Sequence, residues 1–335
     1  MQFRAEFFPK PSEVKIHHGQ KILLIGSCFT AEIGNKLAAN KFSVLQNPHG
    51  IVFNPVSISR ALKDYATEKK YVAEDLFYHH ELYGSWQHHT RFSNPDATET
   101  LNAINGEIQE ASAFLKQADW VIVTLGSAFV YELTDENGAV QQVVANCHKV
   151  PADQFRKRLL STSEAEMELQ QMVDTVRHIR KEARVIFTVS PVRHLRDGFV
   201  ENNRSKAVLI QAVHAVTDND MVQYFPSYEL VLDDLRDYRF YAEDLAHPNY
   251  FATQYVWEKF ISVYMDVHTL TLMKSIHTIR LAVQHKPFNP TAQAHKQFLL
   301  QHLDKSIHLQ ESHTGISFQE EIDFFRNQLE KYHSG

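Results

Sequence analysis

The sequence predicts an α/β protein of three layers, in which helices cover both faces of a doubly wound, mainly parallel sheet. Short apolar runs that suit strands buried on both faces alternate with longer segments of helical periodicity. Helices between successive strands are the crossovers that parallel strands require. The chain has 335 residues, of which 44% are hydrophobic and 22% charged, so it can bury a core of ordinary globular composition.

The first strand and helix are predicted near the start of the chain. Residues 21–26 form an apolar run that ends in glycine, which is typical of a buried strand. Residues 30–42 carry apolar side chains at helical spacing and predict the first helix. A helix over 98–116 and a strand over 119–125 follow in the same order.

The alternation continues in the second half of the chain. It predicts a helix over 164–182, a strand over 184–190, a helix over 203–216 and a fourth strand over 221–225. Four strand–helix alternations of this kind favour a parallel sheet over a helical bundle.

The remaining segments set the domain organisation. Residues 251–284 are predicted helical, as one long helix or a broken one, and Pro287 and Pro290 then interrupt the pattern. Helices over 291–303 and 318–332 follow. We therefore predict one α/β domain over 1–285 and a helical extension over 286–335. Residues 70–96 are irregular, aromatic and rich in histidine, which is typical of an inserted binding loop.

Composition excludes several classes of protein. The net charge of −6 argues against broad nucleic-acid binding, and two distant cysteines exclude a disulfide scaffold or a Cys-rich zinc module. The first residues lack the apolar stretch of a signal peptide, and the most apolar run, 120–130, is far below the ~20 residues of a membrane span. We expect a cytoplasmic protein without membrane contact, with no cofactor and no metal. Dinucleotide, P-loop, GxSxG and HExxH motifs are absent.

Two segments with candidate catalytic residues follow the carboxyl ends of predicted strands, which is where parallel sheets bind their ligands. Ser27 and Cys28 follow the first predicted strand and begin a helix, where free N–H groups favour an anion and lower a thiol pKa. The alternative is that Ser27 only caps the helix and Cys28 is a small buried side chain.

The second segment follows the last predicted strand. Asp244 stands three residues before His247, a spacing at which a carboxylate reaches an imidazole and fixes its tautomer. A capping aspartate followed by a surface histidine is the alternative.

Together these residues carry a family resemblance. Residues 26–30 read GSCFT, 47–55 read NPHGIVFNP, and further similar stretches lie at 144–149, 190–194 and 235–248. Over about residues 1–285 the chain resembles the GSCFA-domain family, which is similar to the SGNH/GDSL hydrolases. The resemblance implies an SGNH-hydrolase-like, flavodoxin-like sheet.

Residue by residue, the resemblance also implies a site. The hydrolase motif Gly-Asp-Ser-Leu aligned without gaps makes Cys28 the nucleophile, while a shift of one residue would choose Ser27. Asp244 and His247 match the final block. Gly50 is the candidate for the oxyanion glycine. The third block reads Gly126-Ser127-Ala128 and lacks its asparagine, for which Ser127, Asn47 and Asn146 are candidate replacements.

Other polar and aromatic residues are candidate substrate contacts. Arg193, His194 and Arg239 suit an anionic group, although a structural ion pair is equally expected. Trp86 and His89, in the inserted loop, suit a saccharide or acyl group, although packing or solvated roles are the common ones.

The resemblance implies an acyl-ester hydrolase or acyltransferase that works through a covalent acyl-enzyme and a Cys/Ser-His-Asp triad. Its expected substrate is a small-molecule or saccharide acyl ester, with water or a hydroxyl as acceptor. Two alternatives remain. One is a non-catalytic ligand-binding module on a hydrolase fold, and the other is a metal-dependent hydrolase that uses the histidines at 79, 80, 88 and 89. The oligomeric state cannot be derived.

Overall fold

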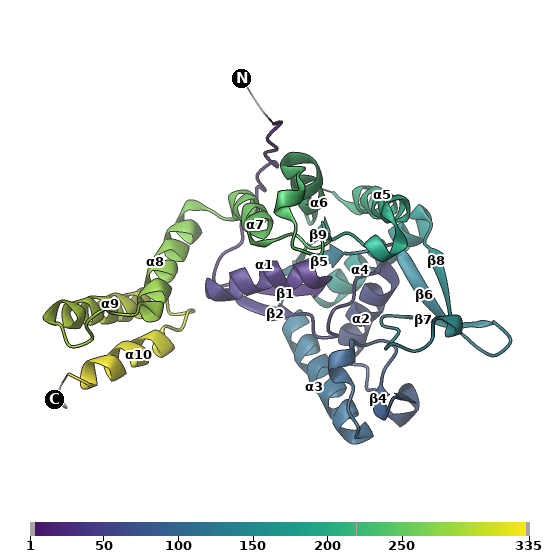
Figure 1. The fold of residues 1–335 in the computed structure, drawn as a ribbon, viewed down its shortest axis with the longest axis horizontal. Coiled ribbons are helices and arrows are strands. Elements are labelled where there is room, and N and C mark those ends of the chain that lie inside the picture. The colour runs from purple at the N-terminus through teal and green to yellow at the C-terminus, as the bar shows by residue number, and fades with distance from the viewer. Residues whose placement is uncertain (1–3, 219, 333–335) are drawn as a thin grey trace.

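A central parallel sheet confirms the predicted fold class. The computed structural model describes residues 4–218 and 220–332. The sheet contains β1 (Lys21–Gly26), β2 (Ser43–Gln46), β5 (Trp120–Leu125), β9 (Arg184–Val189) and β10 (Val222–Phe225). Their spatial order is β10-β9-β5-β1-β2 and every pair is parallel, which is the flavodoxin-like order (Figure 1).

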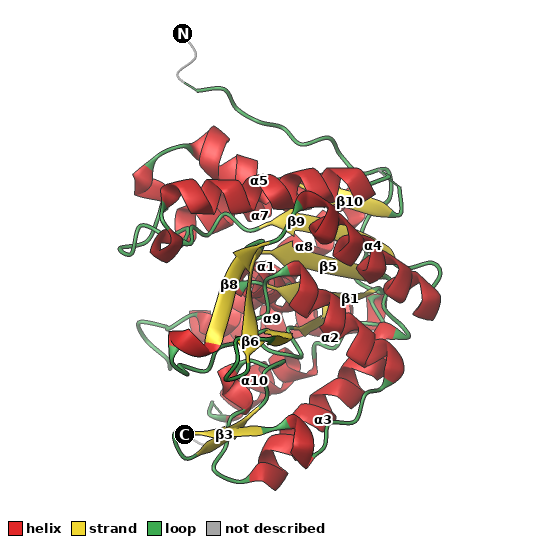
Figure 2. Ribbon diagram, turned by 90° about the vertical axis from the view of Figure 1, so that its right-hand side faces the viewer, coloured by secondary structure: helices red, strands yellow, loops and turns green. Residues whose placement is uncertain are grey.

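Alternate side chains of each strand enter two different cores, as the period of two dictates. Leu23 and Ile25 of β1 face one core, and Ile22 and Leu24 face the other. The first core is covered by α2 (Pro55–Thr67), α3 (Ala97–Leu115), α4 (Thr162–Ile179) and α5 (Phe199–Val216). The second is covered mainly by α1 (Cys28–Ala39) and α7 (Tyr250–Tyr264), which completes three layers (Figure 2).

Several helix boundaries differ from the prediction, and one helix was missed. The helix predicted over 203–216 begins at Phe199, and the helix predicted over 291–303 extends to Ser312. The first helix begins at Cys28, two residues earlier than predicted, so the thiol lies on its first turn. The sequence analysis missed α2, although Asn54 caps it by accepting from the Ser57 N–H and Pro55 occupies its first position. An asparagine before a proline is a helix-start signal in the sequence itself.

A second, antiparallel sheet was also missed. It consists of β6 (Phe129–Thr134), β7 (Val140–Val144) and β8 (Phe155–Leu159), in the order β7-β6-β8. Buried Glu132 holds β8 through bonds from Arg156 and Arg158 at 2.8 and 2.7 Å. The polar outer face of these short strands hides them from a search for continuous apolar runs.

The segment 70–96 is not the irregular loop that was predicted. It contains a hairpin of β3 (Phe77–His79) and β4 (Leu82–Gly84) and two short 3₁₀ turns, Ala73–Asp75 and Thr90–Phe92. Tyr71 and Phe92 form a small core with Ile104 and Ile108 of α3. The aromatic residues here mainly pack the hairpin onto a helix.

The long C-terminal helical stretch is broken, one of the two predicted outcomes. α7 ends at Tyr264, and Asp266 caps α8 (Val267–Gln284) by accepting from the Thr269 N–H. α9 (Gln293–Ser312) and α10 (Gln319–Glu330) follow and lie with α8 beside the sheet (Figure 1). Ile276 and Ile279 of α8 share a separate core with Phe318 and Phe325. The division of the chain at 285 stays a prediction.

The length and hydrophobicity of the helices test whether one of them could span a membrane. No helix within the described residues is long and apolar enough to cross a membrane.

Candidate active site

The turn after β1 is shaped by a glycine that no other residue could replace without rearrangement. Gly26 has a φ of +147°, and a Cβ at this position would lie 2.2 Å from the Thr124 carbonyl oxygen of β5. The Ser27 N–H donates to that same oxygen at 3.1 Å. The chain therefore leaves the sheet between β1 and β5, which is the point where the strand order reverses and where such sheets bind their ligands.

Ser27 and Cys28 have different environments in this turn. The Ser27 hydroxyl is buried, has no hydrogen-bond partner among the described residues and does not cap α1, contrary to the capping alternative. Cys28 is only half-buried. Burial raises the pKa of its thiol, while the N–H groups of Phe29 and of Cys28 itself lower it in part. Of the two, Cys28 is the accessible one and the one that the helix N-terminus stabilises as an anion.

Asp244 and His247 form the pair that their spacing predicts. His247 Nδ1 lies 2.6 Å from one carboxylate oxygen of Asp244, while the other accepts from the N–H groups of Ala246 and His247, both at 3.0 Å. Those three bonds lower the Asp244 pKa to about 2. The carboxylate therefore stays ionised and orients the ring, so that Nε2 is the free nitrogen.

Backbone bonds hold the loop that carries this pair. The Ala242 N–H donates to the His247 carbonyl at 2.7 Å, and the Arg193 N–H donates to the Ala246 carbonyl at 3.1 Å. The second bond ties the loop to the segment after β9. Among the described residues, no hydrogen bond joins His247 Nε2 to Cys28 or to Ser27.

His194 follows Arg193, whose N–H bonds the loop that carries His247. Burial lowers the His194 pKa to about 4, and the charges of Lys206 and His247 contribute to that shift. Lys206 likewise acts on the pKa of Cys28. His194 also packs against Phe53, with ring centroids 5.4 Å apart. His194 therefore has a neutral ring, and its predicted contact with an anionic substrate group stays a prediction.

Among the oxyanion candidates, Asn47 lies beside the nucleophile turn. Its Oδ1 accepts from the Gly26 N–H at 2.9 Å, which fixes the side chain next to the end of β1. Its Nδ2 donates to no group in the part of the chain that the structure describes. Asn47 therefore has a free amide donor on a side chain that is fixed beside the end of β1.

The other oxyanion candidates have different partners. The Gly50 N–H donates to the Asn47 carbonyl at 2.7 Å, and the Gly126 N–H donates to Phe53 at 2.8 Å, so neither is free to bind an oxyanion. The Ser127 hydroxyl lies 3.1 Å from that of Ser205. Asn146 accepts from the His148 N–H at 2.8 Å in a turn of its own.

The substrate-binding candidates also differ in whether they are free or already have a partner. The Arg193 guanidinium lies over the Tyr241 ring at 4.4 Å and forms no ion pair within the described ranges. Arg239 instead pairs with Asp237 at 2.8 Å on the surface. Trp86 stacks on Phe77 with centroids 3.9 Å apart, a packing role. His89 accepts from the Arg91 N–H at 3.2 Å in a 3₁₀ turn.

The histidine-rich segment builds a buried aromatic stack. His88 stacks on His49 with ring centroids 4.2 Å apart and bonds the Ser85 hydroxyl at 3.0 Å. Residues 4–218 and 220–332 contain no group of three or more His, Cys, Asp or Glu side chains placed to hold a metal ion.

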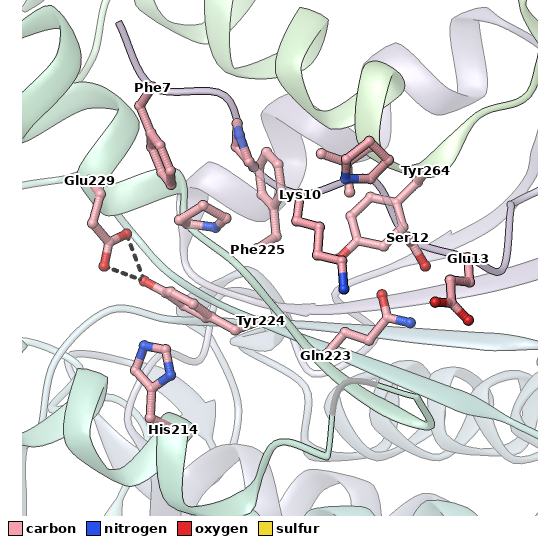
Figure 3. A pocket seen from close by; sticks show the side chains of 14 residues that line it. Phe7, Lys10, Ser12, Glu13, His214, Gln223, Tyr224, Phe225, Glu229 and Tyr264 are labelled. Atoms are coloured by element: carbon pink, nitrogen blue, oxygen red, sulfur yellow. Dashed lines mark hydrogen bonds between the residues drawn. The ribbon is translucent and has the colours of Figure 1, made fainter. Parts of the chain in front are cut away.

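Two cavities are relevant to ligand binding. One of about 300 Å³ is lined by Arg193, Asn203, Tyr228, Arg236 and Tyr238 and adjoins the segment after β9. A second, of about 480 Å³, lies between the N-terminal segment and β10 (Figure 3). There Tyr224 donates to the Glu229 carboxylate at 2.8 Å. Arg193, which lines the first cavity, donates its N–H to the Ala246 carbonyl of the loop that carries Asp244 and His247. We take this cavity as the candidate substrate cavity, although neither Cys28 nor His247 lines it.

Comparison with known proteins gives a family match. The profile of the GSCFA family matches residues 21–260, and that of the "GSCFA domain protein, C-terminal domain" matches 276–331. No curated protein matches the sequence.

Several solved structures are distantly similar. A carbohydrate esterase of family 3 from Talaromyces cellulolyticus has a TM-score of 0.35 at 9% identity, over 77% of this chain and 99% of that one. An acetyl esterase variant with acetate has 0.35 at 10%, over 77% and 99%. An acetyl xylan esterase from Butyrivibrio proteoclasticus has 0.34 at 12%, over 74% and 64%. These similarities are too remote to assign an activity.

Proposed function

Because the chain belongs to the GSCFA family, we propose that it transfers acyl groups from esters, as a hydrolase or acyltransferase, with Cys28 as the nucleophile. The observation that supports this most strongly is the turn at the sheet's switch point. It leaves Cys28 only half-buried on the first turn of α1 and buries the Ser27 hydroxyl.

In the proposed reaction, Cys28 Sγ attacks the ester carbonyl carbon while His247 Nε2 takes the thiol proton. The carbonyl oxygen becomes an oxyanion that accepts from the Cys28 N–H and from Asn47 Nδ2. Collapse expels the alcohol, which receives the proton from His247, and leaves a thioester on Cys28. Water or a hydroxyl acceptor then attacks the thioester, with His247 again as base, and the thiol is restored.

Asp244 keeps the imidazole oriented through both halves of this cycle. Its ionised carboxylate, 2.6 Å from Nδ1, stabilises the charged ring that forms at each proton transfer. Proton transfer needs Nε2 to come within about 3 Å of Sγ or of the substrate oxygen. We propose that the bound substrate brings them to that distance.

We propose a small acyl ester, such as an acylated saccharide, as the substrate. The rings of Tyr238, Tyr250 and Phe251 flank His247 along the chain and are 55%, 69% and 69% exposed, which suits stacking against a sugar. Arg193 adds hydrogen-bond donors at the cavity of about 300 Å³.

The test is to incubate the protein with p-nitrophenyl acetate and with peracetylated glucose, and to map any acetylated peptide by mass spectrometry. We expect hydrolysis of at least one ester and an acetyl group on Cys28. Cys28→Ala should abolish both, and the matched variant Ser27→Ala should keep both within a few-fold.

Two results would contradict the proposal. Loss of turnover in Ser27→Ala but not in Cys28→Ala would move the nucleophile to Ser27. Absence of turnover and of labelling across the ester panel would leave the ligand-binding alternative in its place.

A further inference from the structure

The cavity between the N-terminal segment and β10 holds a carboxylate that no basic side chain neutralises. Glu229 of α6 (Ser227–Glu229) is half-buried there, and the Tyr224 hydroxyl lies 2.9 and 2.8 Å from its two carboxylate oxygens. Within the described residues Glu229 forms no ion pair. A phenol donates one proton and carries no charge, so the negative charge of Glu229 has no counter-ion in a partly desolvated place.

The walls beside this carboxylate are aromatic. Figure 3 shows the rings of Phe7, Tyr224 and Phe225 around the end of the cavity that holds Glu229. Phe225 is 2% exposed and belongs to the core, whereas Phe7 belongs to the N-terminal segment and is 38% exposed. Aromatic rings attract an organic cation through their negative faces, and a carboxylate adds the charge that such a cation needs.

The other charged groups leave this end of the cavity free for a cation. The Lys10 side chain points to the opposite end, beside Gln223 and Tyr264 (Figure 3). His214 packs against the Tyr224 ring, with centroids 5.0 Å apart. No three His, Cys, Asp or Glu side chains in the described ranges are placed to hold a metal ion, which favours an organic cation.

The N-terminal segment that closes the cavity is fixed on both sides of it. The Phe7 N–H donates to Asp234 Oδ2 at 3.2 Å, and the Ser12 N–H donates to the Val263 carbonyl at 3.1 Å. Residues 8–11, between these bonds, include two prolines, which restrict the backbone. The cavity of about 480 Å³ therefore has fixed walls and the size of a small-ligand site, and a ligand has little to reorganise there.

We propose that this cavity binds a small organic cation with an alkylated ammonium group, with Glu229 as its counter-ion and the rings of Phe7 and Tyr224 as its walls. The ligand supplies the positive charge that the protein does not place beside the carboxylate. No residue of this cavity lines the candidate substrate cavity, and neither Cys28 nor His247 lines it. The site is therefore separate from the proposed acyl transfer.

The test is calorimetric titration of the full chain with choline chloride at pH 8 and constant ionic strength. Burial raises the pKa of Glu229, and this pH keeps the carboxylate ionised. The matched ligand is 3,3-dimethyl-1-butanol, which has the shape of choline with carbon in place of the charged nitrogen. We expect choline to bind at least about tenfold more tightly than the alcohol, because the carboxylate and the rings attract only the charged ligand.

Variants of the cavity locate the binding. Glu229→Gln should weaken choline binding about tenfold, because the counter-ion is lost while the shape is kept. Glu13→Gln is the matched control, since Glu13 is an exposed carboxylate at the other end of the same cavity, and should stay within about twofold. Phe7→Leu should weaken choline binding a few-fold, and it keeps the test open if Glu229→Gln does not fold.

Four results would overturn the proposal. Equal affinity for choline and the alcohol would show a cavity that selects only for apolar shape. Equal losses in Glu229→Gln and Glu13→Gln would remove Glu229 as the counter-ion. Tighter binding of sodium acetate than of choline would indicate an anion site at Lys10, and absence of choline binding in the millimolar range would leave no cation site. None of these measurements needs ester turnover.

Discussion

Ser27 and Cys28 are adjacent in the sequence, and only the local backbone separates their roles. The motif leaves the choice open because a shift of one residue exchanges them. The φ of Gly26 and the bond from Ser27 N–H to Thr124 turn the Ser27 side chain into the interior and leave Cys28 on the helix terminus. Backbone conformation thereby leaves Cys28 less buried than Ser27.

The Asp244–His247 pair gives a prediction at this scale. Asp244→Asn should lower kcat by at least about 100-fold, because the imidazole loses the carboxylate that orients it and stabilises its charge. Steady-state hydrolysis of the best ester from the panel measures this. Glu243→Gln, the same change at the neighbouring exposed residue, is the control and should stay within about twofold. Equal effects of both substitutions would remove Asp244 from the mechanism.

Lys206 gives a pH prediction whose sign follows from burial. Its pKa is about 7 in the folded protein and near 10.5 in the unfolded chain, so between these values the unfolded chain binds more protons. Stability therefore rises with pH over this interval. We compare Cys28→Ala with Cys28→Ala/Lys206→Met by urea unfolding at pH 6.5 and 9.5. At pH 9.5 Cys28→Ala should gain stability relative to Cys28→Ala/Lys206→Met. A loss of stability would contradict the lowered pKa of Lys206.

At the scale of elements, the candidate site draws on the ends of four strands and on the loop before α7. β1 supplies the nucleophile turn, β5 and β9 supply the carbonyl groups that hold Lys206, and the loop before α7 supplies His247. Asn47 follows β2 and reaches the end of β1 through its bond to Gly26. In the proposed mechanism Asn47 replaces the asparagine that the third block lacks, from the opposite side of β1, which spacing in one segment could not reveal.

The close approach of β1 to β5 gives a prediction for the element. Gly26→Ala should lower the free energy of unfolding by more than about 2 kcal/mol, because its Cβ would lie 2.2 Å from backbone at a φ of +147°. Gly106 on α3 has open space, so Gly106→Ala should instead stabilise by about 0.5–1 kcal/mol. Urea unfolding measures both. An unchanged free energy of unfolding in Gly26→Ala would mean that the turn accommodates a Cβ without loss of stability.

At the scale of the whole molecule, two cores are joined through α8. Met273 of α8 packs in the core beside the sheet, whereas Ile276 and Ile279 pack with α9 and α10. An ion pair of Lys41 with Glu321 at 2.8 Å adds a polar link between α10 and the α/β body.

A chain ended at residue 285 should therefore remain folded in its sheet but expose the second face of α8. We expect it to bind an anilinonaphthalene sulfonate dye and to self-associate at concentrations where the full chain does not. Dye fluorescence and light scattering measure this. The far-UV circular dichroism spectrum of the truncated chain serves as the internal reference, and it should still show the folded sheet. A truncated chain that stays monomeric and does not bind the dye would contradict the inference that α8 packs in both cores.

The sequence by itself determined the parallel sheet and the Asp244–His247 pair, and it predicted a site at the carboxyl edge of that sheet. These depend on local periodicity and short spacing, which a single segment contains in full. Only the tertiary structure decided that Cys28 is less buried than Ser27, that Asn47 and not Gly50 has a free donor, and that Lys206 bonds the carbonyls that follow β5 and β9. Lys206 lies on the buried stripe of α5 with Leu209 and Val213, a signal present in the sequence. Its meaning depends on two carbonyl groups from distant strands, and contacts of that kind exist only once the sheet has formed.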